Sequence, residues 1–401
     1  MLPHCKEKRE IHARYKSYEV RLYTSINDAE QEWSTHCPTD EYWEAEYHKA
    51  LEDAPPGGLH PLYVTVWKED EWIGLAYFQY KRINLSSSIK SDEETGGLLS
   101  RVKGAALSLL DMYTLVLGNM LVTGKYGCHF SKQFPLEDRS DMVLWLTDWV
   151  SGWLQKKGIK IGPVLIKDFN YGQRFHFAES KKVTEFCVQP NMILTIPEEW
   201  KRVEDYQEAL KSKARIRYRR ARNMVGDLTS RSLQADELMA YADEMHRQYR
   251  NIAENAGFNL FILDRDYFYQ LKVKMKEGIL IKGYFNQEGR LVGFFTVLKN
   301  YDHLDAHFLG YELDVNKEKQ LYLNMLFDMI EEGIKQKVKK IFMSRTAVEI
   351  KSSVGAKAVD VYCYLFHRKS IYNRLVPELV KRLYKPEEWV PRNPFRDQEG
   401  G

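Results

Sequence analysis

The chain has 401 residues, of which 44% are hydrophobic and 13% are aromatic. At about 150 residues per domain this length predicts two to three domains, and the apolar content excludes a wholly disordered or low-complexity protein. The formal net charge is only +3, from 59 basic and 56 acidic residues, so the overall charge points to no particular partner.

The N-terminus and the cysteines point to a reducing compartment. The first ten residues, MLPHCKEKRE, are charged where a secretory signal would be apolar. Five cysteines are scattered along the chain and are nowhere spaced as C-x-x-C: Cys5, Cys37, Cys128, Cys187 and Cys363. This usage argues against a disulfide framework and against a zinc site. We expect a cytoplasmic protein with no bound metal.

The first clear element is a β-hairpin over residues 62–80, LYVTVWKEDEWIGLAYFQY. Two apolar runs flank a short polar turn, Lys68 to Glu71, which is the pattern of paired strands. A segment of membrane length follows at 104–124, but it contains Asp111 and Asn119. A charge in the middle of a span costs about 2.5 to 3.5 kcal/mol. We therefore expect no transmembrane span there, and favour a buried helix followed by a buried strand at 113–119.

The turn at 118–126, GNMLVTGKY, is the nearest match to a phosphate-binding loop. It has one residue too many between its glycines, and Tyr126 stands where Ser or Thr would have to reach magnesium. A turn of close backbone approach remains open, in which the amides of Gly124 and Gly127 and the ammonium of Lys125 would face an anion. A helix over 141–157 and a strand over 161–167 complete this half of the chain.

A basic helix is predicted over about 203–225. Its apolar positions recur every 3.7 residues or so, close to the 3.6 of an α-helix. Between Lys211 and Arg222 seven of twelve residues are Lys or Arg and none is acidic, so the rest of the chain carries 3 − 7 = −4. Three interpretations remain open for this helix: a solvated charged face, a site for the phosphates of a small donor, or an RNA-binding patch.

The second half of the chain repeats the first. A hairpin over 281–299, IKGYFNQEGRLVGFFTVLK, aligns without a gap with the first one when Gly293 is placed on Gly74. A strand candidate at 303–313, a helix over 319–336 and a strand at 340–344 follow, in the order seen after the first hairpin. His303 and His307 stand in the strand pattern about 13 Å apart, too far to share one metal ion.

Charged side chains gather after the last of these strands, in SRTAVEIKSSVGA at 344–356. Arg345, Glu349 and Lys351 fall within seven residues, just past a strand end, where open α/β sheets place ligands. A set of surface ion pairs is the alternative. A further strand at 361–366 leads to His367, which is most simply a structural histidine.

The layout resembles the GNAT acyltransferase fold in duplicate, as in the FemAB-like acyl and aminoacyl transferases. SKARIRYRRAR at 212–222 resembles the K-x-R-x-x-x-R-R-A-x-K entry segment of that family, with Asn223 in place of the last Lys. GRLVGFF at 289–295, LGYE at 309–312 and the run ending in Lys351 follow in the family's order. The resemblance covers residues 200–375 well and 20–170 in layout only.

The resemblance implies an α/β fold of two tandem GNAT-like units, each a mixed sheet flanked by helices. We place the units at 1–195 and 196–385, with a tail at 386–401. One departure concerns the donor: where GNAT enzymes have the phosphate loop Q/R-x-x-G-x-G/A, this chain has QLYLNM at 320–325. Acyl-CoA as co-substrate is therefore in question, and aminoacyl-tRNA is the other donor used in the family.

If the chain is an acyltransferase, the resemblance implies direct attack of an amine acceptor on the donor, with no permanently bound cofactor. In this hypothesis Glu312 is the base or acceptor anchor, Tyr311 the proton donor, and Lys351 with Arg345 binds an anionic group. The other candidate binding residues are Glu349, Arg215, Arg217, Arg219 and Asn324. The alternative function is a non-catalytic tandem-GNAT protein that binds a cell-wall precursor or RNA.

Overall fold

The computed structural model describes residues 10–83, 112–170, 174–177, 183–255, 261–374, 376–383 and 389–396. The chain divides into two compact units. Unit 1 comprises residues 1–188 and 361–385, and unit 2 comprises residues 189–360 and 386–401. The predicted boundaries differ from these, since they assigned 361–385 to the second unit and made 386–401 a separate tail.

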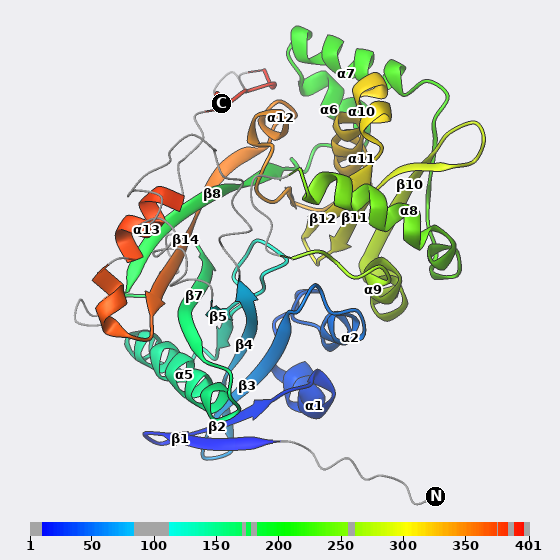
Figure 1. Ribbon diagram of the computed structural model, residues 1–401. Helices are drawn as coiled ribbons and strands as arrows, with labels where there is room; N and C mark the ends of the chain where they lie inside the picture. Colours follow the sequence, from blue (N-terminus) through cyan, green and yellow to red (C-terminus); the bar gives the residue numbers. More distant parts are fainter. Residues whose placement is uncertain are drawn as a thin grey trace, which may run out of the picture. The chain divides into compact units, whose positions relative to one another are not determined.

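Unit 1 is a sheet with helices on both faces (Figure 1). Its elements are β1 (Ile11–Tyr15), β2 (Tyr18–Tyr23), α1 (Ile26–His36), α2 (Ala45–Asp53), β3 (His60–Lys68), β4 (Glu71–Ile83), β5 (Met112–Leu117), β6 (Cys128–Phe130), α5 (Leu136–Lys156), β7 (Ile161–Phe169), η4 (Ser370–Arg374) and α13 (Val376–Leu383). The strand order is β1-β2-β3-β4-β5-β7-β14, where β14 spans Lys357–His367, and β6 pairs with β4. Neighbours are antiparallel except β5 and β7, which are parallel.

Alternation along the strands of unit 1 explains its two layers. Leu62, Val64 and Phe78 point to one face and pack against α5. Tyr63 and Tyr77 point to the other face, where Tyr63 meets Trp33 of α1 with ring centroids 5.4 Å apart. Because successive side chains of a strand face opposite ways, one strand can supply both cores.

Unit 2 repeats this plan. Its elements are β8 (Thr184–Thr195, which begins in unit 1), α6 (Val203–Ala209), α7 (Ser212–Val225), β9 (Thr229–Ser232), α8 (Ala235–Ala253), α9 (Tyr267–Met275), η3 (Lys276–Gly278), β10 (Ile279–Phe285), β11 (Leu291–Lys299), β12 (His303–Tyr311), α10 (Leu313–Lys319), α11 (Leu321–Lys335), β13 (Lys340–Phe342) and α12 (Val348–Ser352). The strand order is β8-β13-β12-β11-β10-β9, antiparallel except for the parallel pair β12 and β13. The two predicted hairpins are thus β3–β4 and β10–β11, and the predicted repeat is confirmed.

The last strand of each sheet is exchanged between the two halves of the chain. β8 follows β7 in sequence, yet its residues 193–195 pair with β13 in unit 2. β14 follows β13, yet its residues 362–367 pair antiparallel with β7 in unit 1. The placement of residues 361–385 in unit 1 and the return of residues 386–401 to unit 2 give each unit two separate stretches of sequence.

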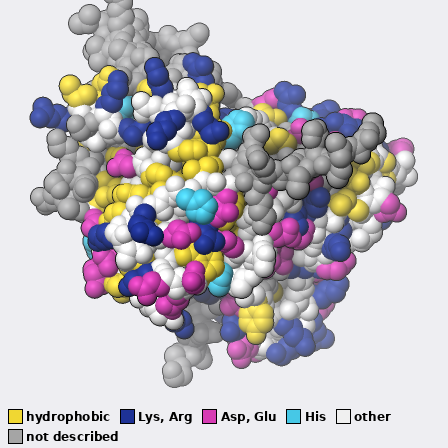
Figure 2. All heavy atoms as spheres, turned by 90° about the horizontal axis from the view of Figure 1, so that it is seen from below, with side chains coloured by type: hydrophobic (Ala, Val, Ile, Leu, Met, Phe, Trp, Pro, Cys, Tyr) yellow, Lys and Arg dark blue, Asp and Glu magenta, His cyan; other side chains and the backbone are white. Residues whose placement is uncertain are grey.

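The membrane-length segment falls partly on β5. Residues 112–117 form that strand, which is buried from Thr114 onward, and residues 104–111 lie outside the described part of the chain. No helix in the described ranges has the length and apolarity needed to cross a bilayer. Figure 2 shows one face of the molecule, on which acidic and basic side chains both occur.

Candidate functional site

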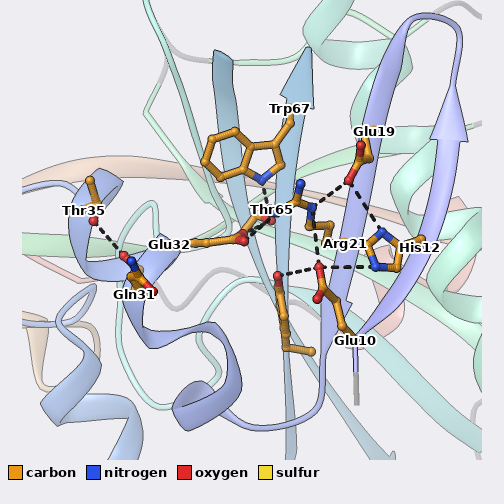
Figure 3. Close-up of polar contacts among 10 residues, drawn as sticks. Glu10, His12, Glu19, Arg21, Gln31, Glu32, Thr35, Thr65 and Trp67 are labelled. Atoms are coloured by element: carbon orange, nitrogen blue, oxygen red, sulfur yellow. Dashed lines mark hydrogen bonds and ion pairs between the residues drawn. The ribbon is translucent and has the colours of Figure 1, made fainter. Parts of the chain in front are cut away.

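In the polar network of unit 1 drawn in Figure 3, the side chains form hydrogen bonds and ion pairs with one another. Arg21 of β2 donates to Glu19 at 2.8 Å and to Glu32 of α1 at 2.6 Å. Glu32 also accepts from Thr65 at 2.8 Å, and Thr65 accepts from the Trp67 indole at 2.9 Å. These bonds fasten α1 to β2 and β3, so we assign the network to structure rather than to ligand binding.

The glycine-containing turn of unit 1 is also closed. The amide of Gly124, which the sequence offered to an external anion, donates at 3.2 Å to the carboxylate of Asp168. The ammonium of Lys167 donates to the Val122 carbonyl at 2.6 Å and also to Asp168. Both charged side chains are buried. The anion in this turn is therefore the unit's own carboxylate, and the external anion site that the sequence left open is not supported.

The predicted basic helix is broken in two in unit 2. α6 ends at Ala209 and α7 begins at Ser212, because Leu210 and Lys211 have extended backbone angles. The C-terminal segment causes the break: Leu210 forms a β-bridge with Phe395, and the Lys211 amide donates to Pro394 at 2.8 Å. The expectation of one continuous helix over 203–225 is wrong, since helical periodicity cannot report a bridge to a distant segment.

Arg215 caps the end of α6 at this break. Its guanidinium donates to three carbonyls at the end of α6, those of Gln207 at 3.0 Å, Glu208 at 2.9 Å and Leu210 at 3.1 Å. The last carbonyls of a helix lack intrahelical partners, so this is a capping role. Arg215 therefore caps α6 and does not take the phosphate-binding role that the resemblance implied.

A cluster of buried and partly buried polar groups fixes α7 to α11. Asp328 of α11 accepts from Arg222 at 2.5 Å, from the Tyr284 hydroxyl at 2.5 Å and from Lys282 at 3.0 Å. Asn324, one turn earlier and fully buried, donates to the Ala221 carbonyl at 3.0 Å. Asn324, a predicted ligand-binding residue, therefore joins two helices instead of facing a ligand.

A cavity of about 550 Å³ opens between α7 and the start of α11. It is lined by Lys213, Ile216, Arg217, Arg220, Asn316, Gln320, Tyr322, Leu323 and Ile350. Three of these nine side chains are cations and none is acidic. Burial is the main reason that the pKa of Arg217 lies below its usual value, and the nearby Arg392 adds to the effect. A bound anion would oppose both effects, so the cavity is suited to an anionic ligand.

The start of α11 differs from a phosphate-binding loop. Gln320 has left-handed backbone angles, φ +49 and ψ +44, and the amide of Tyr322 donates to the side chain of Asn316 at 2.8 Å. Leu323 projects into the cavity and Met325 is fully buried. The side chains that would hold an anion here come from α7, whose cations would take the place of the free backbone amides that a glycine loop presents.

β12 and β13 separate after a short stretch of pairing. Their parallel pairing covers only His303–Asp305 and Lys340–Phe342. From Ala306 to Tyr311, β12 continues beside β11, and the Ser344 hydroxyl bonds the Ala306 carbonyl at 3.1 Å. An irregularity in the β11–β12 register accompanies the separation, and Thr296 fills it by bonding the Phe308 amide and carbonyl at 2.9 and 2.7 Å.

Glu312 stands at the end of β12, as the N-cap residue of α10. Both oxygens accept from the guanidinium of Arg247, one of them at 3.0 Å, and Gln248 donates at 3.3 Å. The hydrogen bond from Arg247 is the main reason that the pKa of Glu312 lies below its usual value. A carboxylate held in this way is a weak base, so its geometry suits anchoring better than proton abstraction.

Tyr311 lies beside the cavity. Its ring centroid is 6.2 Å from that of Tyr322, which lines the cavity. A phenol is protonated at neutral pH, and burial raises the pKa of Tyr311 further above that range. That state is the one a proton donor needs.

The charged run after β13 folds into a tight loop and a short helix. Ser344, Thr346 and Ala347 have φ of +58, +65 and +46, in the left-handed region that costs energy for residues other than glycine. The Lys351 ammonium, in a residue only 5% exposed, donates to the carbonyls of Arg345 at 2.6 Å and Ser344 at 3.4 Å. Burial lowers the pKa of Lys351 to about 7. Lys351 thus holds the loop, and its ammonium does not point to an anion site.

The remaining predicted residues are distributed as follows. Glu349 forms an ion pair with Arg392 of the C-terminal segment, as the surface alternative expected. Arg219 is exposed on α7 but does not line the cavity, whereas Arg217 does. His303 pairs with Asp305 at 3.1 Å and His307 contacts Tyr267 at 2.7 Å, so the two histidines have separate partners. Within the described residues no group of three His, Cys, Asp or Glu side chains is placed to hold a metal ion.

Sequence reasoning missed Lys213, Arg220 and Tyr322. The signal was available for α7, because Lys213, Ile216, Arg217 and Arg220 have the i, i+3, i+4, i+7 spacing of one helical face. For Tyr322 no signal was available, since an apolar stripe with a tyrosine reads as core.

Comparison with known proteins establishes the architecture. No protein-family model matches the chain, and no curated protein sequence matches it. The crystal structure of FemX is similar over 88% of this chain and 98% of its own, with a TM-score of 0.50 and 11% identity. A tandem GNAT protein from the clavulanic acid biosynthesis pathway covers 87% and 98% at a TM-score of 0.47 and 8% identity, and L-PGS from Bacillus licheniformis covers 86% and 96% at 0.46 and 11%. The chain therefore has the fold of FemX, and the predicted α/β architecture of two tandem units, each with a mixed sheet flanked by helices, is confirmed.

Proposed function

We propose that the protein is an acyltransferase that moves an acyl or aminoacyl group from an activated donor to an amine by direct attack. The observation that carries this proposal is the cationic cavity of unit 2, in a GNAT-like fold and beside Tyr311. Its volume of about 550 Å³ lies within the roughly 300 to 1,000 Å³ of small-molecule sites. A pantetheine thioester with its phosphates is the donor that suits this size and charge.

In this proposal Lys213, Arg217 and Arg220 bind the donor phosphates. The acceptor amine attacks the thioester carbonyl, so a C–N bond forms and the C–S bond breaks. Tyr311, which like any tyrosine is protonated at neutral pH, donates a proton toward the leaving thiolate. Glu312, ionised and held by Arg247, positions the acceptor ammonium by charge. The ammonium loses one proton to solvent to become the attacking amine, and the second proton, released when the C–N bond forms, returns to the Tyr311 phenolate. Aminoacyl-tRNA is the alternative donor class, and a cell-wall precursor is the alternative to a small amine as acceptor.

Binding and turnover of acetyl-CoA test the proposal. We expect acetyl-CoA to raise the melting temperature of the protein, and Arg217→Ala and Arg220→Ala each to weaken binding by about tenfold, the loss of one charge-assisted contact. Lys335→Ala, at an exposed cation of α11 that does not line the cavity, is the matched control. Thiol release should require an added amine.

The outcomes separate the alternatives. Equal acetyl-CoA binding by the wild type, Arg217→Ala and Arg220→Ala would refute the donor site. Tight binding with no thiol release for any amine in a broad panel would favour the non-catalytic binding protein.

A further inference from the structure

The exposed side of α7 has an aliphatic side chain at its centre. Ile216 is 67% exposed, although aliphatic side chains usually lie inside. Tyr218 and Ala221 face the other way and are buried in the core of unit 2. Ile216 is therefore not held at the surface by a poor fit of α7, because the helix has a complete inner face without it.

Cations surround Ile216 on this exposed side. At 100° per residue, Lys213 and Arg220 lie within about 60° of Ile216 on the cavity side, and Arg219 lies about 60° away on the other. Lys213, Arg219 and Arg220 are exposed, and within the described ranges none of them forms an ion pair. α7 itself contains six basic residues and no acidic one. The face thus combines an apolar centre with a positive rim.

We propose that this face of α7 docks an acidic carrier domain, which delivers its acyl thioester on a phosphopantetheine arm into the adjacent cavity. The proposal rests on the proposed function, because the acyl transfer site receives the arm. Ile216 and Arg220 belong both to the exposed face and to the cavity lining. A carrier seated on the face would therefore hold its arm at the cavity mouth, with Arg217 placed to bind the single phosphate of the arm.

The chemistry of the face favours a protein over RNA. Phosphate backbones are bound by cations and single-stranded bases by stacking on aromatic rings, but the only aromatic residue of α7, Tyr218, is buried. An exposed isoleucine ringed by arginine and lysine instead matches a protein interface, in which an apolar centre is enclosed by complementary charge.

Binding of a purified acyl carrier protein tests the docking. Fluorescence anisotropy with the labelled carrier should show saturable binding that weakens as salt increases, and the holo form should bind more tightly than the apo form without its arm. Ile216→Asp and Arg219→Glu should each weaken binding at least tenfold, as losses at an interface centre and rim do. Lys335→Glu, the same charge reversal on α11, should leave binding within twofold of the wild type.

Each result has a definite meaning. Carrier binding that Ile216→Asp leaves unchanged overturns the proposal, as does the absence of carrier binding when acetyl-CoA still raises the melting temperature; in the latter case the proposed function stands alone. Preferred binding of a transfer RNA, indifferent to Ile216→Asp, also overturns it. If the wild type binds the carrier, Ile216→Asp loses this binding and no amine leads to consumption of the thioester, the docking is supported and the proposed acyltransferase activity is refuted. Circular dichroism of Ile216→Asp checks that the variant is folded.

Discussion

Replacing Asp328 by Asn should loosen the attachment of α7 to the rest of unit 2. The carboxylate accepts hydrogen bonds from Arg222 and Tyr284, each at 2.5 Å, and lies 3.0 Å from Lys282. The amide keeps the shape of the side chain but removes its charge and replaces one acceptor oxygen by a donor. Arg222 would then keep Glu331 as an anionic partner, at 3.4 Å, besides its hydrogen bonds to Tyr218 and Asn324, each also at 3.4 Å.

The expected cost follows from the exposure of the partners. Removing one member of a buried ion pair costs about 3 to 5 kcal/mol, because the other charge is left unpaired. The Asp328 side chain is 7% exposed, but those of Arg222 and Lys282 are 24% and 25% exposed, so water would solvate them in part. We therefore expect a loss of about 2 to 3 kcal/mol, or roughly 30- to 160-fold in the unfolding equilibrium of unit 2.

Hydrogen exchange of α7 and α11 amides at neutral pH measures this loss, since exchange reports local opening directly. The matched control is Glu331→Gln, which removes the charge of the 53% exposed partner and should cost at most about 1 kcal/mol. Burial by itself would raise the pKa of Asp328, but Arg222 and Lys282 bring it below the usual value. The stabilisation is thus present above the unfolded pKa and declines as pH falls through the folded one. Equal losses in Asp328→Asn and Glu331→Gln would refute this account.

Three further perturbations test other parts of the structure. Burial lowers the pKa of Lys351 from 10.5 to about 7, so between these pH values the unfolded chain binds one proton more than the folded chain, and unit 2 should gain stability from pH 7 to pH 10. Denaturant titrations should show that Lys351→Met abolishes this gain. A gain that persists in the variant would contradict the assignment. Gly310→Ala should destabilise unit 2 by about 3 kcal/mol, because the added Cβ would lie 2.5 Å from the Tyr249 amide nitrogen. The control Gly152→Ala, in α5 with open space around it, should be neutral or stabilising by up to about 1 kcal/mol. Similar melting temperatures of the two variants would count against the close approach of α8 and β12. Arg21→Leu should lower the free energy of unfolding of unit 1 by about 2 kcal/mol, measured by thermal unfolding, because Glu19 and Glu32 lose their shared cation. If the exposed control Arg14→Leu lowers this free energy by as much, the network contributes little.

Local pattern was sufficient for the elements that stand alone. The hairpins at 62–80 and 281–299 were predicted correctly because alternation and a polar turn are short-range signals. Tyr311 beside the cavity and Arg217 within it were also reached from sequence, through a resemblance rather than a pattern. The catalytic roles assigned to these residues stay predictions.

Distant contacts account for what the sequence could not predict. The break at Leu210 depends on Phe395, far along the chain, and the destination of β14 depends on the edge of β7, much earlier in the sequence. Arg215, Asn324 and Lys351 belong to residue types that bind ligands, yet each is directed to backbone carbonyls. Only the folded geometry distinguishes a cation that caps a loop or helix from one that awaits an anion.

The position of β14 imposes an order of events on synthesis. β7 is complete once residue 169 has been made, but its partner on the side away from β5 begins to pair only at Tyr362. At translation rates of 5 to 20 residues per second, that edge would wait about 10 to 40 s for its neighbour. An unpaired edge strand is a template for association with other chains. A nascent chain truncated before residue 362 would therefore be prone to aggregate, and a chaperone that shields the β7 edge would raise the yield of the folded protein.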